Sequence, residues 1–220
     1  AGPTQEAIDP VRFISNRSSG KMGYALAEAA CARGAEVVLV SGPTALPPPT
    51  GVEYCPVITA EEMRKAMTSR LAWSDTVIMA AAVADFRPAR PSPQKLKKRR
   101  GPVTALDLEA TDDILRELNE RRTHQLLVGF AAETEDLLAH AREKLHAKGV
   151  DLLIANDVTA AGSGFGSDSN RVWLFAPEHA PVELPLLPKR EVAERILDHM
   201  LTVQTGRQTS SRPSRPHRKE

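Results

Sequence analysis

Residues 13–23 carry the side chains of this chain that are best suited to binding a phosphate. Backbone N–H groups exposed at the start of a helix, together with the helix dipole, favour an anion there. The spacing matches neither a P-loop nor a G-x-G-x-x-G dinucleotide fingerprint. The stretch predicts a phosphate-binding turn, with a polar loop that caps an ordinary helix as the alternative. It places an amide, two hydroxyls and two glycines ahead of an apolar helical pattern: Asn16, Ser18, Ser19, Gly20 and Gly23.

Two groups of cations could hold the phosphates of a ligand. The run Lys95–Arg100 follows three closely spaced prolines and is typical of a basic flap that could close over a triphosphate. Lys144 and Lys148 are four residues apart and therefore share one face of a helix. The alternative for both groups is a solvated charged surface.

The predicted elements that must position these side chains alternate between strands and helices. Such alternation indicates an α/β fold with a doubly wound, mainly parallel, Rossmann-like sheet and helices on both faces. Ligands of these sheets bind at the carboxyl ends of the strands. The pattern predicts strands near 36–41, 75–80, 126–131, 151–155 and 171–176, and helices after residue 20 and near 60–72, 113–122, 135–148 and 189–203.

Composition and charge exclude several function classes. The chain has 220 residues, with 29 basic and 28 acidic side chains, so no overall field attracts nucleic acid or an anionic membrane. No apolar run reaches the roughly 18 residues that span a bilayer. We therefore expect a cytoplasmic protein that binds neither nucleic acid nor membrane.

We expect one domain over residues 1–204, followed by a disordered basic tail over 205–220 that is rich in Ser, Arg and Pro. The opening residues, Ala1–Thr4, are of the kind that follows a strand, and no apolar run precedes them. A first strand of the sheet is therefore expected to be missing, so that either another segment or chain fills its place or the core is weakened.

Six motifs, in order, resemble those of the phosphopantothenoylcysteine synthetase family. The resemblance extends to about residue 201, and the first motif is highly specific. It is closest to the bacterial, CTP-dependent form, which is often the C-terminal half of a protein fused to phosphopantothenoylcysteine decarboxylase. The motifs are Asp9–Gly23, Ala80–Asp85, Lys95–Lys98, Val128–Thr134, Ala155–Asp157 and Gly164–Asp168.

The resemblance implies a ligase of coenzyme A biosynthesis. 4′-Phosphopantothenate would react with CTP to give an acyl cytidylate and pyrophosphate, and the amine of L-cysteine would then displace CMP. Mg²⁺ is expected from triphosphate chemistry, held mainly by phosphates and water because no carboxylate cluster marks a metal cage. The long stretches 87–104 and 162–171 would build a dimer interface and a substrate cover, which implies a homodimer with sites near the interface.

The resemblance also implies roles for individual residues. Asn16 would stabilise the oxyanion during amine attack, and Lys95 would assist activation of the carboxylate. The expected substrate-binding residues are Arg12, Ser18, Ser19, Gly20, Asn156 and Asp157. The expected nucleotide-binding residues, besides Lys95, are Met79, Ala80, Ala81, Asp85, Thr111, Asp112, Asp113, Ile114, Phe130, Lys144 and Lys148.

The stretch 111–114 departs from the family pattern at one position. Asp112 stands where the family usually has a proline, and Thr111 is expected to cap the helix that follows.

Two rival functions remain open. A nicotinamide or flavin oxidoreductase is disfavoured, because no dinucleotide fingerprint opens the first helix and no acidic residue ends the strand near 36–41. A catalytically impaired module that binds nucleotide or serves assembly is kept open by the missing strand and by Asp112. Measuring turnover would distinguish this impaired module from the ligase.

Overall fold

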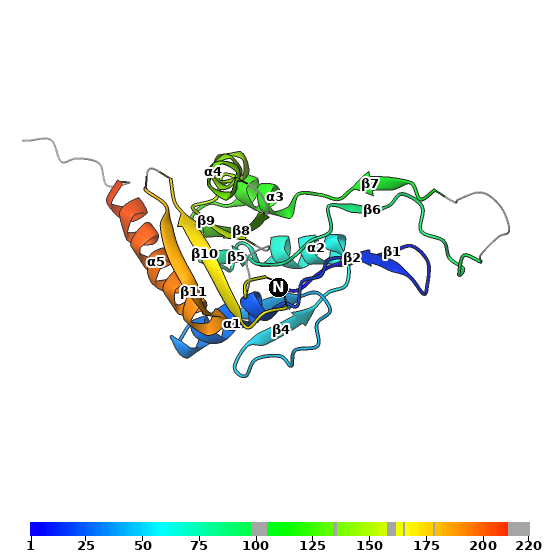
Figure 1. The fold of residues 1–220 in the computed structure, drawn as a ribbon, viewed down its shortest axis with the longest axis horizontal. Helices are drawn as coiled ribbons and strands as arrows, with labels where there is room; N and C mark the ends of the chain where they lie inside the picture. Colours follow the sequence, from blue (N-terminus) through cyan, green and yellow to red (C-terminus); the bar gives the residue numbers. More distant parts are fainter. Residues whose placement is uncertain (98–104, 134–135, 158–161, 165, 178, 211–220) are drawn as a thin grey trace, which may run out of the picture.

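The computed structural model describes residues 1–97, 105–133, 136–157, 162–164, 166–177 and 179–210 (Figure 1). The helices are α1 (Lys21–Ala32), α2 (Ala60–Arg70), α3 (Ile114–Arg121), α4 (Leu137–Lys148) and α5 (Lys189–Ser210). The strands are β1 (Gln5–Ala7), β2 (Phe13–Ser15), β3 (Val38–Ser41), β4 (Glu53–Pro56), β5 (Thr76–Met79), β6 (Phe86–Pro88), β7 (Leu108–Ala110), β8 (Leu126–Glu133), β9 (Leu152–Asp157), β10 (Ser169–Phe175) and β11 (Val182–Pro188).

The central sheet has the order β11-β10-β9-β8-β5. Strands β5, β8 and β9 are parallel, and β10 and β11 add an antiparallel edge. Strands β3 and β4 form a separate parallel pair. The predicted α/β class with a mainly parallel sheet is confirmed.

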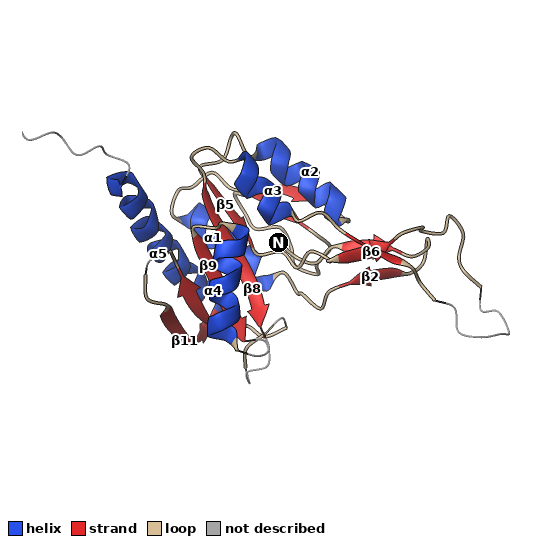
Figure 2. Cartoon of the chain, turned by 90° about the horizontal axis from the view of Figure 1, so that it is seen from above, coloured by secondary structure: helices blue, strands red, loops and turns tan. Residues whose placement is uncertain are grey.

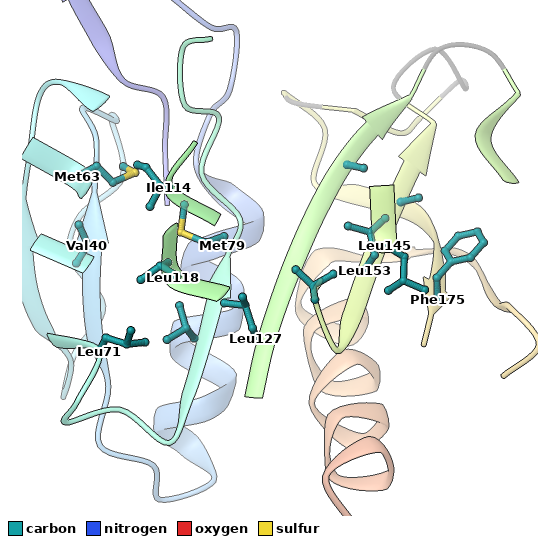
Figure 3. Close-up of a cluster of buried hydrophobic side chains, with 14 of the residues drawn as sticks. Val40, Met63, Leu71, Met79, Ile114, Leu118, Leu127, Leu145, Leu153 and Phe175 are labelled. Atoms are coloured by element: carbon teal, nitrogen blue, oxygen red, sulfur yellow. The ribbon is translucent and has the colours of Figure 1, made fainter. Parts of the chain in front are cut away.

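Helices cover both faces of this sheet. Leu127 of β8 packs in the layer of α2, α3 and α4, whereas its neighbour Val128 packs in the layer of α1 and α5. Successive side chains of a strand point to opposite faces, so an unbroken apolar strand such as β8 requires cover on both. Figure 3 shows the cluster of buried side chains on the face covered by α2, α3 and α4, to which Met63, Leu118 and Leu145 belong.

Local sequence signals explain where the helices begin. Thr59 and Glu62 form a reciprocal capping box at the start of α2. At α3 the cap is Asp113, whose carboxylate accepts from the backbone nitrogen of Arg116. The expectation that Thr111 caps this helix is therefore wrong, because the Thr111 hydroxyl donates instead to the Ala84 carbonyl at 2.6 Å.

An arm projects from the body in Figures 1 and 2. We define the arm as the antiparallel pairs β1–β2 and β6–β7 with their connecting residues, and the two pairs contact each other through β1 and β6. These short strands were not predicted, and neither were β4 and β11. The predicted excursion 87–104 begins in β6, and its residues 98–104 lie outside the described residues.

The closing helix is longer than predicted. Helix α5 continues to Ser210, so residues 205–210 of the expected tail are helical, and 211–220 lie outside the described residues. Arg207 contacts the Asp151 carboxylate at 2.9 Å, which ties this last part of the helix to the sheet. Among the described helices, none combines the length and the apolar character that crossing a membrane requires.

Candidate functional site

A cavity of about 510 Å³ lies at the carboxyl ends of β5, β8 and β9, where ligands of doubly wound sheets bind. The starts of helices from both faces of the sheet and the ends of its strands border this cavity. Its wall contains most of the predicted site residues: Asn16, Ser18, Ser19, Gly20, Met79, Ala80, Ala81, Asp85, Thr111, Asp112, Asp113, Ile114, Phe130, Lys144, Lys148 and Asn156.

The predicted phosphate turn leads into α1 at this cavity. Gly20 precedes the helix with φ 78°, a left-handed conformation that favours glycine. A Cβ atom at Gly20 would also lie 2.7 Å from the Thr44 methyl group. The Ser18 hydroxyl accepts from the Gly20 amide at 3.3 Å, which helps to shape the turn. The first amides of α1 therefore border the cavity, the arrangement that binds anions.

Asn16 links the turn to the end of β5. Its Nδ2 donates to the Ala82 carbonyl at 3.0 Å and lies 3.4 Å from the Val83 carbonyl. Gly20 is the residue that precedes α1, so Asn16 is not the N-cap of this helix. The side chain is exposed on the cavity wall and can reach a ligand.

The turn at 111–114 lies against the segment that follows β5. The Thr111 amide donates to the Asp85 carbonyl at 3.0 Å. The Asp113 carboxylate accepts from Lys148, so α3 and α4 are joined at the cavity wall. Burial alone would raise the pKa of Asp113, but the hydrogen bond from Lys148 and the Arg116 amide lower it below its ordinary value.

The other predicted residues on the wall come from three elements. Lys144 and Lys148 both lie on it, as their shared helix face predicts. Phe130 is half-buried and packs against the α1/α5 core, and Asn156 lies near the end of β9. The side chain of Asp157 lies outside the described residues.

Arg12 and Lys95 do not line this cavity. Nη2 of Arg12 bonds to the Asp9 carboxylate at 2.6 Å and to the Leu96 carbonyl at 3.0 Å, and the Leu96 amide donates to Asp9 at 3.1 Å. The hydrogen bond from Arg12 holds the pKa of Asp9 well below its usual range. The start of the predicted flap, including exposed Lys95, is thus held on the arm. The rest of the basic run, 98–100, lies outside the described residues.

Two lysines on the wall were missed by the sequence analysis. Lys189, 6% exposed, donates from Nζ to the carbonyls of Gly164 and Ser167 at 2.9 and 2.6 Å. Burial, followed by the charge of Lys21, lowers the pKa of Lys189. Lys21 bonds to Asp168 at 2.6 Å, and this bond lowers the pKa of Asp168. Lys21 falls within the first motif, whereas nothing local marked Lys189.

No cluster of three or more His, Cys, Asp or Glu side chains that could hold a metal occurs in the described part of the chain. Near the cavity, Asp85 and Asp112 are exposed and Asp113 is bonded to Lys148. This donor set fits an ion held mainly by ligand phosphates and water.

Comparison with known proteins identifies close relatives. The model of a family described as the DNA/pantothenate metabolism flavoprotein C-terminal domain matches residues 1–203. The coenzyme A biosynthesis bifunctional protein CoaBC of Bacillus subtilis is 53% identical over 209 residues, which are 94% of this chain and 51% of that protein. The protein of the same name from Vibrio vulnificus is 45% identical over 92% of this chain and 51% of its own length. The chain thus spans about half the length of these curated relatives.

A solved structure shares the fold over almost its whole length. The crystal structure of the C-terminal domain of the coenzyme A biosynthesis bifunctional protein CoaBC superimposes with a TM-score of 0.79 and 45% sequence identity. The match covers 94% of this chain and 95% of that one.

Proposed function

Because the chain belongs to the family of the DNA/pantothenate metabolism flavoprotein C-terminal domain, we propose that it is the ligase that joins 4′-phosphopantothenate to L-cysteine in coenzyme A biosynthesis. The cavity at the sheet's carboxyl edge carries this proposal. The cavity is bordered by the start of α1, which is suited to phosphate, and by the Asn16 amide. Lys144 and Lys148, both on α4, also border it.

The reaction has two steps that balance without a redox partner. In the first, a carboxylate oxygen of 4′-phosphopantothenate attacks the α-phosphorus of CTP, and the bond to pyrophosphate breaks. In the second, the cysteine amine attacks the acyl carbon, the bond to CMP breaks, and the amine loses a proton. The products are 4′-phosphopantothenoylcysteine, CMP and pyrophosphate.

The cavity wall supplies groups for each part of these substrates. Ala80 and Ala81 leave room for a ring against the end of β5, and Asp85 offers acceptors to ribose hydroxyls. Lys148, already oriented by Asp113, and Lys144 would bind the triphosphate. The amides at the start of α1 would hold a second anionic group.

Asn16 would act in the second step. Its amide lies between the phosphate turn and the Ala82 carbonyl on the cavity wall, where we place the junction of the two substrates. A donor fixed there would stabilise the negative charge that develops on the acyl oxygen when the amine attacks.

Mg²⁺ is part of the proposal as a partner of the triphosphate. The exposed carboxylates Asp85 and Asp112 could contribute to its shell, with phosphates and water providing the remaining ligands. The bound ion would neutralise charge on the phosphate oxygens.

We also propose that the chain acts as a homodimer through the arm. The arm and the residues next to it expose a set of large apolar side chains: Val11, Phe13, Phe86, Leu96, Leu106 and Leu108. Such a patch on a projecting element marks an interaction surface. A second copy that covers it would also bring Arg12 and Lys95, which lie outside the cavity of their own chain, into contact with another molecule.

A decarboxylase partner is a further part of the proposal. The curated relatives are described as bifunctional and are about twice as long as this chain. This supports a phosphopantothenoylcysteine decarboxylase fused to or associated with the ligase, and the expected cytoplasmic location stays a prediction.

The test is release of pyrophosphate from the purified chain, with CTP or ATP and with each substrate omitted in turn. We expect release with CTP and 4′-phosphopantothenate alone, followed by a cysteine-dependent product. A folded chain that binds nucleotide without releasing pyrophosphate would instead be the impaired module. Equal rates with ATP would retain the ligase and remove the preference for CTP.

A further inference from the structure

Asp9 is a buried carboxylate of the arm that does not border the large cavity. It lies in the turn between β1 and β2, and its side chain has no exposed surface. A carboxylate buried so completely is costly unless hydrogen bonds satisfy its oxygens. Within the described residues it accepts five hydrogen bonds, so Asp9 joins several parts of the arm.

The two carboxylate oxygens of Asp9 have different partners. Oδ1 accepts from the backbone nitrogens of Val11 and Arg12, both at 2.9 Å, and so closes the turn between β1 and β2. Oδ2 accepts from Nε and Nη2 of Arg12 at 3.1 and 2.6 Å and from the Leu96 amide at 3.1 Å. One oxygen thus shapes the residue's own turn, whereas the other holds a residue 87 positions away.

Leu96 is held at both polar groups of its backbone. Its amide donates to Asp9, and its carbonyl accepts from Nη2 of Arg12 at 3.0 Å. We call these two bonds the grip. The same stretch is also tied to the turn further upstream, because the Ser92 amide donates to the Ile8 carbonyl at 2.9 Å. The stretch is therefore fixed against the turn at two points.

The grip restricts where two cations lie. Lys95 and Lys97 flank Leu96, and both side chains are exposed. A lysine on an unrestrained segment would sample many positions, and each of them costs entropy to leave. Because the grip fixes the backbone from which both side chains extend, part of this entropy is lost before a substrate binds.

Asp9 is suited to this task because it keeps its charge. The hydrogen bond from Arg12 holds the pKa of Asp9 well below its usual range, although burial opposes the shift. An ionised carboxylate accepts stronger hydrogen bonds than a neutral group does. An asparagine at this position would have the same size, but one of its two polar atoms would be a donor that faces other donors.

We propose that Asp9 is a positioning residue of the ligase, whose Oδ2 fixes the backbone of Leu96 and thereby places Lys95 for the attack of the 4′-phosphopantothenate carboxylate on CTP. The proposal rests on the proposed function, in which Lys95 assists this first step. A cation that is fixed beforehand stabilises charge on the reacting phosphate better than a mobile one does. Asp9 itself touches no substrate and acts through Lys95.

The experiment follows Leu96 and the first reaction step in one set of variants. Asp9→Asn keeps the size of the side chain, whereas Asp9→Ser can still cap the turn between β1 and β2 but is too short to reach Leu96. Asp107→Asn, an exposed carboxylate of the arm that pairs with Arg90, is the matched control. Protection of the β8 amides, 126–133, shows which variants remain folded.

Hydrogen exchange tests the grip directly. In both Asp9 variants we expect the Leu96 amide to exchange about tenfold faster than in the wild type, with unchanged exchange in β8. Equal exchange of Leu96 in the wild type and in a folded Asp9 variant would overturn the proposal. A wild type that never releases pyrophosphate would instead overturn the proposed function and the reaction step with it, whereas the exchange rates would still report the grip.

Kinetics test whether Asp9 acts through Lys95. At saturating CTP and 4′-phosphopantothenate, we expect Asp9→Asn to release pyrophosphate about tenfold more slowly while nucleotide affinity is kept. In a Lys95→Gln background the same substitution should slow release by less than about twofold, because the two residues serve one interaction. Equal factors in the two backgrounds would overturn the proposal. Faster release would overturn it as well, because the grip would then hold Lys95 away from the substrates.

Arg12 is the other route by which Asp9 could act. It is a predicted substrate-binding residue, and Asp9 bonds to its guanidinium group. An effect through Arg12 would raise the KM for 4′-phosphopantothenate and would persist in the Lys95→Gln background. A defect that consists only of this change in KM would assign Asp9 to Arg12 and overturn its role in placing Lys95.

Discussion

At the scale of single residues, the Asn16 amide makes a structural contact and has a proposed chemical role. It joins the phosphate turn to the Ala82 carbonyl, and its side chain is exposed on the cavity wall. Structural and chemical roles can be separated because the proposed reaction has two steps, of which only the second develops charge on the acyl oxygen.

We predict that Asn16→Ala still forms the acyl cytidylate but converts it to product about 10²–10³-fold more slowly, the usual cost of losing one oxyanion donor. Rapid-quench mass spectrometry would detect the accumulated intermediate. Asn119→Ala, in α3 and away from the cavity wall, is the matched control. A wild-type rate of amide formation would rule out this role.

Lys95 tests the first step. It lies on the arm beside Leu96, which Asp9 and Arg12 hold, so it can act only if the arm segment moves or a second chain presents it. We expect Lys95→Gln to slow pyrophosphate release at saturating CTP while nucleotide binding persists. Arg90→Gln, another exposed cation of the arm, should leave release unchanged. Unaltered release in Lys95→Gln would remove the lysine from the mechanism.

At the scale of elements, the start of α3 depends on Asp113. Asp113→Ala removes the helix cap and the partner of Lys148, so we expect it to lower the free energy of unfolding by about 1 kcal/mol at pH 7. It should also raise the KM for CTP, because Lys148 loses its orientation. The control is Asp107→Ala, an exposed carboxylate of the arm.

The Asp113 effect has a defined pH dependence. The pKa of Asp113 is lower in the folded chain than in the unfolded one, where it is about 3.9. Its contribution to stability is therefore present above the unfolded pKa and is lost as pH falls through the folded pKa. Urea denaturation should show the difference between wild type and Asp113→Ala shrinking below pH 4, and a constant difference would contradict the assignment.

The loop that carries Gly164 and Ser167 is bonded to the buried ammonium of Lys189. Lys189→Met keeps the length of the side chain but leaves the carbonyls of Gly164 and Ser167 without this donor, which costs about 1–3 kcal/mol. We predict lower stability and faster hydrogen exchange confined to this loop. Lys65→Met, on the exposed side of α2, should change neither quantity. Unchanged exchange in Lys189→Met would show that other contacts hold the loop.

At the scale of the whole molecule, the arm is the proposed dimer interface. Phe86→Asp places a charge in its exposed apolar patch, so we expect a concentration-dependent dimer to dissociate to monomers in analytical ultracentrifugation. Leu201→Asp, equally exposed but on α5, should keep the wild-type mass. A Phe86→Asp protein that remains dimeric would locate the interface elsewhere.

Much of the body could be predicted from local patterns. The apolar run of β8, the capping signals at α2 and the glycine turn before α1 act between residues close in sequence, so the element types and the fold class could be read without a structure. The arm could not, because β1, β2, β6 and β7 have three residues each, which is too short for a clear alternating pattern, and each forms only by pairing with another short strand.

The candidate site, like the fold, was predictable only where it depends on residues close in sequence. By itself the sequence determined the family, the sheet class, and which side chains would lie at strand ends and helix starts. The tertiary structure decided that Asn16 bonds to Ala82, that Arg12 holds Leu96 on the arm, and that Lys189 closes a wall of the cavity. These contacts join residues 66, 84 and 25 positions apart. The spacing of apolar residues indicates only the structure of a short stretch of chain, whereas contacts over such separations depend on how the whole chain packs.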